Sequence, residues 1–419
     1  MTRAGLRPNR RLAAIAVAVV LAGGAVRLSP ALDPAPATAQ RIVAVGDVHG
    51  ELGGFTAILR EAGLIDHSGS WVGGAATLVQ LGDVLDRGPR PRAVFDLLMR
   101  LEAEAARAGG QVIMLLGNHE AMNLLGITRD VNRDAFAEFV NEGSQRRRAD
   151  ALAELERQRR RRAEELGGDP TLSGEAAEQW LAMHPPGFIE YSEALGPDGV
   201  YGTWLRRRPT AVILGDTLFI HGGYGPALAG VGIDEINRRT AAELSTFDST
   251  RAWMVAEGLA LPWSSAIELV SEAQRELDWL ASRPPEMAPP ERLARAGRLQ
   301  LSWDRWYLMA EDGPIWFRGL ATFDEAEHGP DIAALLDGLG VARQVVGHFP
   351  YPDGSIRARF AGRVLLIDTG MLASVYGGRA SALEIVGGTV TAIYPGERQT
   401  LADGSQPQAP AAVSSPTGR

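Results

Sequence analysis

Carboxylate, amide and imidazole side chains follow several short apolar runs of this 419-residue chain, in turns that also contain glycine. The turns are Gly46-Asp47-Val48-His49-Gly50, Gly82-Asp83, Gly117-Asn118-His119-Glu120, His221-Gly222-Gly223 and Gly347-His348. Oxygen and imidazole ligands without thiolates suit divalent or trivalent metal ions with hydrolytic roles. One such turn arises readily by chance, but five in series predict a metal-dependent hydrolase. The predicted metal ligands are Asp47, His49, Asp83, Asn118, His221 and His348.

A site of this kind can hold two metal ions about 3.5 to 4 Å apart, which need a bridging carboxylate and two sets of terminal ligands. Asp83 is the natural bridge. Hydroxide held between the ions would be the nucleophile, because coordination lowers the pKa of water from about 15.7 towards about 7. We therefore expect two divalent or trivalent cofactor ions, with Mn, Fe or Zn favoured by the ligand types, and no covalent enzyme intermediate.

Strand-like apolar runs at residues 41–45, 76–81 and 111–116 come directly before the first three turns. Helical patterns at residues 55–62 and 91–108 separate them, and this βαβ alternation predicts an α/β fold with a partly parallel sheet. Sites in such sheets lie at the carboxyl ends of the strands, which is where the predicted ligands stand. Further strands are predicted at residues 211–214, 217–220, 343–346, 363–367, 381–386 and 389–394.

Two stretches, at about residues 129–209 and 234–304, lack the βαβ alternation and are predicted to be helical inserts. In the first insert, residues 144–166 are rich in arginine with interleaved glutamates, which predicts a solvated helix; a substrate-gating or partner-docking cap is the alternative. Residues 401–419 lack apolar periodicity and are predicted to be disordered. The expected organisation is a signal peptide at 1–39, one catalytic domain at 40–400 and this tail.

The N-terminus has the layout of a secretory signal. Four arginines precede an apolar run at residues 12–21, and Ala37-Thr38-Ala39 offers a cleavage site before Gln40. The apolar run is shorter than the roughly 20 residues that a membrane span needs. We expect cleavage after Ala39 and a periplasmic or secreted protein with no stable membrane span; an uncleaved N-terminal membrane anchor is the alternative.

The composition excludes some partners. Residues 1–39 carry five Arg and one Asp, so their removal would change the formal net charge from −9 to −13. An acidic surface argues against nucleic-acid binding as the main task, since that binding depends on basic side chains that neutralise phosphates. The chain has no cysteine, so an oxidising compartment would leave it unchanged. The oligomeric state cannot be predicted.

The ligand turns, together with Gly82-Asp83-Val84-Leu85-Asp86-Arg87-Gly88, resemble the phosphoprotein phosphatase branch of the calcineurin-like metallophosphoesterases. The Trp316-Phe317-Arg318-Gly319 segment and the exported, insert-bearing layout look most like the bacterial Shewanella-like protein phosphatases. The resemblance implies a mixed β-sandwich flanked by helices, with the helical inserts forming a cap over the metal cleft.

The resemblance also implies roles for individual residues. Asp83 would bridge the two metal ions, with Asp47 and His49 completing one site and Asn118, His221 and His348 the other. His119 matches the general acid that protonates the leaving group, and Asp86 matches the carboxylate that orients it. Arg87 and Arg318 match the arginines that hold the phosphate, with Asn118 also binding substrate.

We therefore expect a metallophosphatase that hydrolyses phosphorylated Ser/Thr or Tyr side chains of a phosphoprotein or phosphopeptide. The first alternative is a nucleotide or dinucleoside-polyphosphate phosphohydrolase, as in other members of the branch. A second alternative is a non-catalytic metal-binding module of the cell envelope. The presence of His119, Asp86 and Arg87 argues against it.

Overall fold

The computed structural model describes residues 40–166, 169, 171–282, 284, 291, 294–297, 303–351 and 353–402. The predicted signal segment and residues 403–419 of the predicted tail lie outside this range. Every described helix falls short of the length or the apolar character that crossing a membrane requires.

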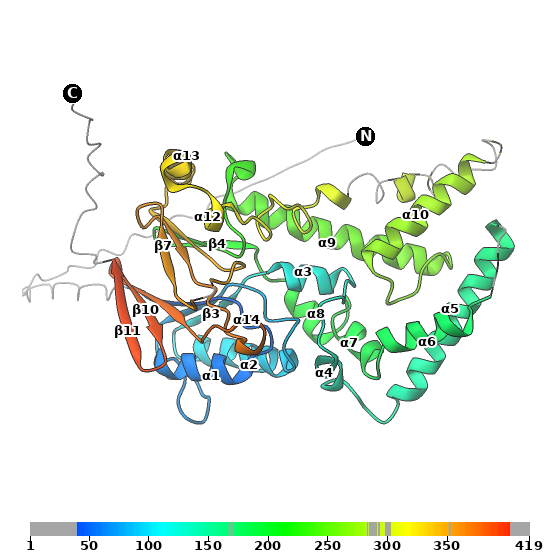
Figure 1. Ribbon diagram of the computed structural model, residues 1–419, viewed down its shortest axis with the longest axis horizontal. Helices are drawn as coiled ribbons and strands as arrows, with labels where there is room; N and C mark the ends of the chain where they lie inside the picture. The colour runs from blue at the N-terminus through cyan, green and yellow to red at the C-terminus, as the bar shows by residue number, and fades with distance from the viewer. Residues whose placement is uncertain are drawn as a thin grey trace, which may run out of the picture. The chain divides into compact units, whose positions relative to one another are not determined.

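Six strands form the first sheet, in the order β11-β10-β9-β1-β2-β3. Figure 1 shows β10 and β11 together at one edge of this sheet. They are β1 (Arg41–Val45), β2 (Thr77–Gln80), β3 (Gln111–Met114), β9 (Ala382–Val386), β10 (Thr389–Tyr394) and β11 (Glu397–Ala402). The first three strands are parallel, as the βαβ pattern predicts. The last three are antiparallel, and β9 pairs with β1, so the C-terminal part of the domain completes the sheet begun at its N-terminus.

Five strands form the second sheet, in the order β4-β5-β6-β8-β7. They are β4 (Ala211–Leu214), β5 (Thr217–Ile220), β6 (Arg343–Val346), β7 (Arg357–Arg359) and β8 (Val364–Leu366). The central strands β5, β6 and β8 are parallel, and the edge strands β4 and β7 run antiparallel to their neighbours.

Two edge strands were not predicted. Both β7 and β11 consist largely of exposed polar residues, which is usual for an edge strand but gives no apolar pattern to detect. As a result, β11 runs two residues past the predicted domain end at residue 400.

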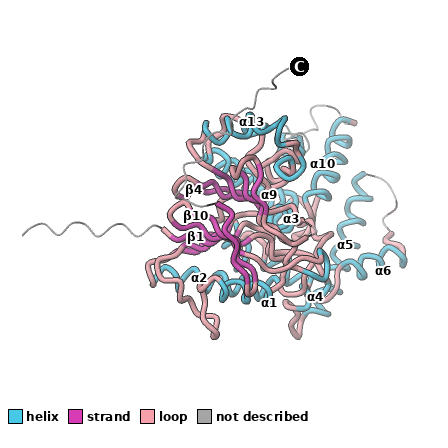
Figure 2. The backbone as a smooth tube through the Cα atoms, turned by 60° about the vertical axis from the view of Figure 1, so that its left-hand side comes forward, coloured by secondary structure: helices cyan, strands magenta, loops and turns pink. Residues whose placement is uncertain are grey.

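Helices flank both sheets and fill the two inserts (Figure 2). Beside the sheets lie α1 (Leu52–Glu61), α2 (Pro91–Arg107), α3 (Asn118–Leu124), α12 (Gly319–Thr322), α13 (Glu325–Gly338) and α14 (Ala373–Tyr376). The first insert contains α4 (Arg133–Ala137), α5 (Ser144–Leu166), α6 (Gly174–Met183), α7 (Phe188–Ala194) and α8 (Val200–Leu205). The second contains α9 (Ile233–Ala256) and α10 (Ala266–Ala281), and short 3-10 helices lie at Pro226–Leu228 and Trp303–Arg305.

The core is layered because the strands are apolar on both faces. Ile42 of β1 points between the two sheets and packs in one cluster with Phe219 and Leu365 of the second sheet. Val43, its neighbour in the strand, points to the other face and joins the cluster that contains Phe55 of α1. The outer face of the second sheet packs against α13 in a third cluster. The result is a β-sandwich between two layers of helices, as predicted.

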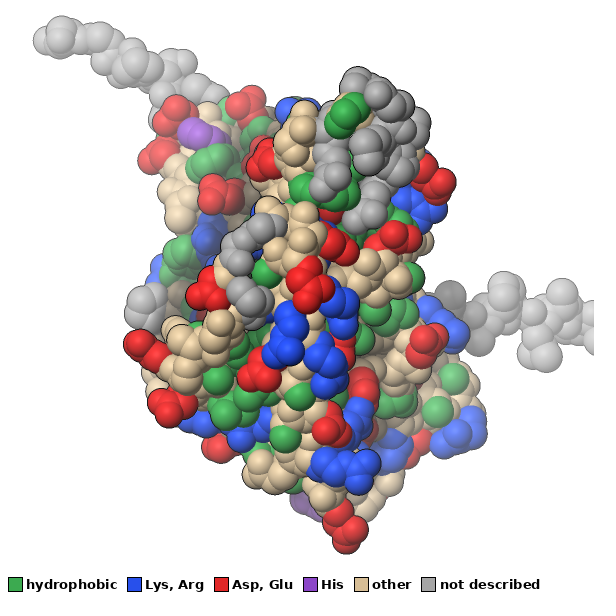
Figure 3. Space-filling model, turned by 90° about the vertical axis from the view of Figure 1, so that its right-hand side faces the viewer, with side chains coloured by type: hydrophobic (Ala, Val, Ile, Leu, Met, Phe, Trp, Pro, Cys, Tyr) green, Lys and Arg blue, Asp and Glu red, His purple; other side chains and the backbone are tan. Residues whose placement is uncertain are grey.

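The insert helix α5 is solvated along most of its length, and basic and acidic side chains are interspersed on the face seen in Figure 3. Glu154 pairs with Arg157 at 2.7 Å and with Arg161 at 3.1 Å. Arg162 is the buried exception: it donates to Glu272 at 2.7 Å and to Glu276 at 3.0 Å, both on α10. This buried arginine joins the two inserts to each other.

Candidate active site

The predicted side chains lie close together, at the carboxyl ends of parallel strands from both sheets. The first sheet supplies Asp47 and His49 after β1, Asp83 after β2, and Asn118 and His119 after β3, while the second supplies His221 after β5 and His348 after β6. None of these side chains belongs to a residue more than 6% exposed. Residues from opposite ends of the chain touch here, since the His348 backbone N–H donates to Asp47 Oδ1 at 3.0 Å.

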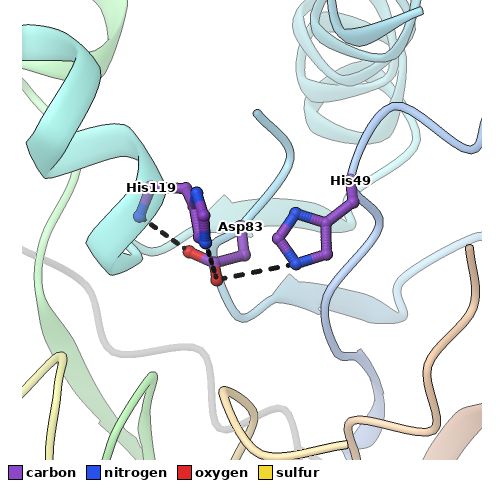
Figure 4. Close-up of side chains that lie close together, drawn as sticks. All are labelled: His49, Asp83 and His119. Atoms are coloured by element: carbon purple, nitrogen blue, oxygen red, sulfur yellow. Dashed lines mark hydrogen bonds and ion pairs between the residues drawn. The ribbon is translucent and has the colours of Figure 1, made fainter. Parts of the chain in front are cut away.

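Asp83 lies at the centre of the cluster. His49 Nε2 and His119 Nε2 each lie 3.9 Å from its Oδ2, on either side of the carboxylate (Figure 4). His221 Nε2 lies 3.3 Å from its Oδ1. Burial favours the neutral carboxyl, but His221 and His119 outweigh burial and hold the pKa of Asp83 well below its usual range. Asp83 is therefore a buried carboxylate anion with imidazoles around it.

Two of the histidines are oriented by backbone carbonyls. His49 Nδ1 lies 2.9 Å from the carbonyl oxygen of Leu85, and His221 Nδ1 lies 2.9 Å from that of Leu81. When Nδ1–H donates to the carbonyl, the tautomer is set and Nε2 is left with its lone pair facing the cluster. Burial also lowers the pKa of His49 to about 3, which keeps this imidazole neutral.

The donor set fits metal ions. His49, Asp83 and His119 offer ligand atoms within 4.8 Å of one another, and so do Asp83, His221 and His348, with Asp83 common to both groups. His221 Nε2 lies 2.9 Å from Asn118 Oδ1 and 3.3 Å from Asp83 Oδ1, so an imidazole nitrogen, an amide oxygen and a carboxylate oxygen converge, and metal ions bind such a donor set. Burial lowers the pKa of His348 to about 2, and a neutral imidazole is the form that binds metal.

His119 and Asp86 form a buried pair beside this cluster. His119 Nδ1 lies 2.6 Å from Asp86 Oδ2, and Asp86 is fully buried. Burial disfavours the imidazolium, yet the negative charges of Asp83 and Asp86 raise the pKa of His119 to about 9. The imidazole is therefore protonated at neutral pH and presents Nε2–H on the side of Asp83.

Arg87 and Arg318 lie at the periphery of the site. Arg87 Nη1 donates to the hydroxyl of Tyr376, and that hydroxyl lies 3.2 Å from His49 Nε2, so the guanidinium reaches the cluster. Arg318 is exposed, and its guanidinium has no hydrogen bond or ion pair with any described residue. Its charge is close enough to His348 to contribute to the lowered pKa of that group, after burial and His221. The structure thus brings ten predicted residues to one region, with Arg318 at its rim.

Backbone strain is concentrated at these residues. Seven described non-glycine residues have positive φ, and five of them are predicted site residues: His49, Asp83, Asp86, Arg87 and His348. This left-handed conformation is unfavourable for residues with a Cβ and persists where the surroundings impose it, which is common at functional sites. The clustering is independent of side-chain chemistry and marks the same site.

Glu120 joins the strained Asp83 turn to the turn that carries Asn118. Its carboxylate accepts the backbone N–H of Asp83 at 2.7 Å, Val84 at 2.8 Å, Leu85 at 3.1 Å and Gly117 at 3.0 Å. Residue 117, one of these donors, must be glycine, because a Cβ there would lie 2.2 Å from Asp83 Oδ1. The Asp83 and Asn118 turns are therefore fixed relative to each other.

Two residues at this site, Asp368 and Tyr376, were not predicted from the sequence. Asp368 is buried, and it directly follows the predicted strand at 363–367 in Asp368-Thr369-Gly370, the same signal that identified the other ligands. Burial raises the pKa of its carboxyl to about 6. Tyr376 stacks on His49 with ring centroids 5.5 Å apart. A lone tyrosine in α14 carries no sequence signal of this kind.

Comparison with known proteins places the chain in a family. Residues 40–254 match the model of the calcineurin-like phosphoesterases, and the chain belongs to that family. Shewanella-like protein phosphatase 2 of Arabidopsis thaliana is 27% identical over 351 residues, which cover 83% of this chain and 75% of that protein. Shewanella-like protein phosphatase 1 of Plasmodium berghei is 26% identical over 233 residues, covering 54% and 52% respectively.

Solved structures share the fold. A cold-active protein tyrosine phosphatase superposes with a TM-score of 0.56 at 22% identity, covering 87% of this chain and 80% of that chain. The cold-active protein-tyrosine phosphatase of a psychrophilic Shewanella species gives a TM-score of 0.55 at 22% identity, covering 87% and 81%. The predicted family, fold and enzyme class, a calcineurin-like metallophosphatase, are confirmed.

Proposed function

We propose that this enzyme is a phosphomonoesterase that acts on phosphorylated side chains of proteins. The observation that carries the proposal is the convergence, around Asp83, of a metal-ligand cluster and a buried imidazole–carboxylate pair, with an arginine at the edge of the cluster. A relative that covers 83% of this chain bears the name protein phosphatase, which supports a phosphoprotein or phosphopeptide substrate. Phosphotyrosine and phosphoserine/threonine both remain within the proposal.

We propose two metal ions at this site, held by the six predicted ligands. Asp83 would belong to both ions, with His49 at one and His221 and His348 at the other. Asp47, whose carboxylate lies 4.0 Å from His49 Nε2, would complete the first set, and Asn118, whose Oδ1 lies 2.9 Å from His221 Nε2, would complete the second. His119 also lies close to His49 and Asp83, but its pairing with Asp86 assigns it to proton transfer. The mixture of carboxylate, amide oxygen and imidazole favours Mn, Fe or Zn. Bound ions supply Lewis-acid chemistry, because they neutralise charge on phosphoryl oxygens and lower the pKa of water.

The side chains have separate tasks in the proposed reaction. His119 donates a proton from Nε2 to the leaving-group oxygen, and Asp86 holds the ring through Nδ1 and stabilises its positive charge. Arg87 binds phosphate oxygens, for which its planar fork is suited. Only Nη1 of Arg87 donates to the Tyr376 hydroxyl, so Nη2 and Nε can donate to the substrate while this contact is kept. Asn118 and Arg318 complete the phosphate contacts, Arg318 from the rim.

A phosphate-release panel tests the substrate class. Purified, metal-analysed protein is assayed on phosphotyrosyl, phosphoseryl and phosphothreonyl peptides, on nucleotides and on dinucleoside polyphosphates. We expect release from at least one phosphopeptide class with kcat/KM above that for the nucleotides. Release from nucleotides or dinucleoside polyphosphates alone would replace this proposal by the phosphohydrolase alternative. Bound metal without any turnover would favour the non-catalytic module.

We also propose export of the protein, by cleavage after Ala39, to the periplasm or medium. The support is the sequence of residues 1–39 alone. N-terminal sequencing of protein recovered from fractionated cells tests this proposal, with Gln40 as the expected first residue. An intact N-terminus in the membrane fraction would instead favour the uncleaved anchor.

A further inference from the structure

The first helical insert reaches the His119–Asp86 pair through a buried hydrogen bond. Tyr191 lies on α7, within the insert, and is 1% exposed. Its hydroxyl donates to Asn123 Oδ1 at 2.6 Å, between residues 68 positions apart in the sequence. Asn123 lies on α3, one helical turn after His119. A side chain of the insert is thus one residue away from the proposed acid pair.

Asn123 connects Tyr191 to Asp86 by hydrogen bonds. Its Nδ2 donates to Asp86 Oδ1 at 2.8 Å and to the carbonyl oxygen of His119 at 2.9 Å. Asp86 Oδ2 is the atom that meets His119 Nδ1, at 2.6 Å. Each oxygen of the carboxylate therefore has its own partner, and this fixes the rotation of the Asp86 side chain. The four residues Tyr191, Asn123, Asp86 and His119 form one chain of hydrogen bonds in the buried interior.

The insert itself holds Tyr191, the first residue of this series of hydrogen bonds, in place. The ring of Tyr191 packs edge-on against Phe136 at 5.0 Å and against Phe139 at 5.2 Å between centroids. Both phenylalanines belong to the same insert, Phe136 on α4 and Phe139 just after it. Edge-to-face aromatic contacts and burial restrict the ring, so the hydroxyl is presented to Asn123 from a fixed position.

The same insert also contacts the residue next to Asp86. The backbone N–H of Arg87 donates to the carbonyl oxygen of Asp130 at 2.9 Å, and Asn132 Nδ2 donates to the carbonyl oxygen of Arg87 at 2.9 Å. Asp86 and Arg87 both have positive φ, at 69° and 65°. The insert therefore supports this strained pair from its backbone side as well as through Asn123.

We propose that Tyr191 and Asn123 are positioning residues for the Asp86–His119 acid pair, which makes the first helical insert part of the machinery that protonates the leaving group. The inference rests on the proposed phosphomonoesterase function. It assigns to the insert a role in the chemical step, in addition to any role as a cap. It also distinguishes Tyr191 from a tyrosine that only fills the core.

The experiment compares two leaving groups. Phenyl phosphate releases phenol, whose pKa is about 10, as for a tyrosine side chain. The anion released from 4-nitrophenyl phosphate is a far weaker base and depends less on protonation. A residue that positions the general acid therefore affects phenyl phosphate more strongly, whereas a residue that supports the fold or the metal ligands affects both substrates alike. The kcat of each variant is measured on both substrates, with KM, metal content and the thermal midpoint.

Tyr191→Phe removes one hydroxyl and keeps the ring. We expect kcat to fall by roughly tenfold on phenyl phosphate, a fraction of the 10² to 10⁴ typical of a whole general acid, and by less than about twofold on 4-nitrophenyl phosphate. KM and metal content should change little. Tyr201→Phe is the matched control: Tyr201 is a 4% exposed tyrosine of the same insert whose hydroxyl donates to Asp96, at 2.7 Å, away from the acid pair. It should leave kcat unchanged on both substrates.

A double-mutant cycle excludes a purely structural explanation. In a His119→Asn background, Tyr191→Phe should cost no further kcat, because the group that it positions is gone. Asn123→Ala is the second variant, with the same selective loss expected. Equal losses on the two substrates, or full additivity with His119→Asn, would overturn the role of Tyr191 and Asn123 while leaving the phosphatase intact. A wild-type enzyme that hydrolyses neither aryl phosphate nor any phosphopeptide would instead overturn the proposed function, and the inference with it.

Discussion

Glu120→Gln is the substitution whose consequences the structure defines most sharply. The Glu120 carboxylate accepts four backbone N–H groups, two on each oxygen: those of Asp83 and Gly117 on Oε2, and those of Val84 and Leu85 on Oε1. In glutamine, an NH₂ group replaces one oxygen and faces two donors. Hydrogen bonds to charged groups contribute about 1.5–3 kcal/mol each, so we expect a loss of about 3–6 kcal/mol in the free energy of unfolding.

Activity should fall as well, because Glu120 joins the Asp83 turn to the Asn118 turn. A displacement of about 1 Å at a catalytic site can cost on the order of 10² in rate, so we expect kcat to fall at least about tenfold at a temperature where the variant remains folded. The assays are urea unfolding and phosphate release on the same preparation.

Glu243→Gln is the matched control. Glu243, on α9, is a second buried carboxylate that accepts backbone N–H groups, from Tyr307 at 3.0 Å and Leu308 at 3.1 Å. It also pairs with Arg239 at 3.1 Å, and none of these partners is a predicted site residue. This variant should lose stability and keep its kcat within about twofold. The reasoning is refuted if Glu120→Gln changes the free energy of unfolding by less than about 1 kcal/mol, or if both variants lose activity equally.

Three further predictions concern His119, the metal ions and a half-buried histidine of the first insert. His119→Asn should lower kcat by about 10² to 10⁴ with little change in thermal midpoint; activity within tenfold of wild type would contradict its role as the acid. Chelation should abolish phosphate release and lower the thermal midpoint, since an ion bound only to the native state at 100 times its Kd stabilises it by about 2.7 kcal/mol; full activity after verified metal loss would contradict metal dependence. Burial lowers the pKa of His184, so the unfolded chain takes up a proton first as the pH falls through about 6.5, and stability falls there. Thermal midpoints between pH 7.5 and 5 should therefore fall less steeply in His184→Gln, and identical slopes would contradict this.

The metal ligands could be predicted because each one is marked by the few residues that precede it. Each ligand follows an apolar run within a few residues, and parallel strands place their carboxyl ends at the same edge of a sheet. This rule is enough to expect Asp47 and Asp83 together, because β1 and β2 are neighbours in one sheet. It does not place His348 beside them, because His348 follows a strand of the second sheet and the packing of the two sheets is not encoded locally. Asp368 also directly follows a predicted apolar strand, so it could have been predicted in the same way.

The hydrogen-bond chain from the insert could not be predicted in this way. Tyr191 and Asn123 lie on helices whose sequence patterns predict which faces are buried but not what each buried polar group meets. Their contact depends on how α7 packs against α3, a relation between segments 68 residues apart. The edge strands β7 and β11 were missed for a simpler reason, since exposed polar residues give no periodicity to detect.

The division of the site between two sheets has a consequence for how the enzyme matures. The contact between the His348 N–H and Asp47 closes a loop of 301 residues, and contacts of such large sequence separation are slow to form because the entropy of loop closure must be lost before they are made. Either sheet alone holds only part of the ligand set. A refolding chain should therefore regain its sheet and helix signals before it regains activity, and partly folded chains should be catalytically silent.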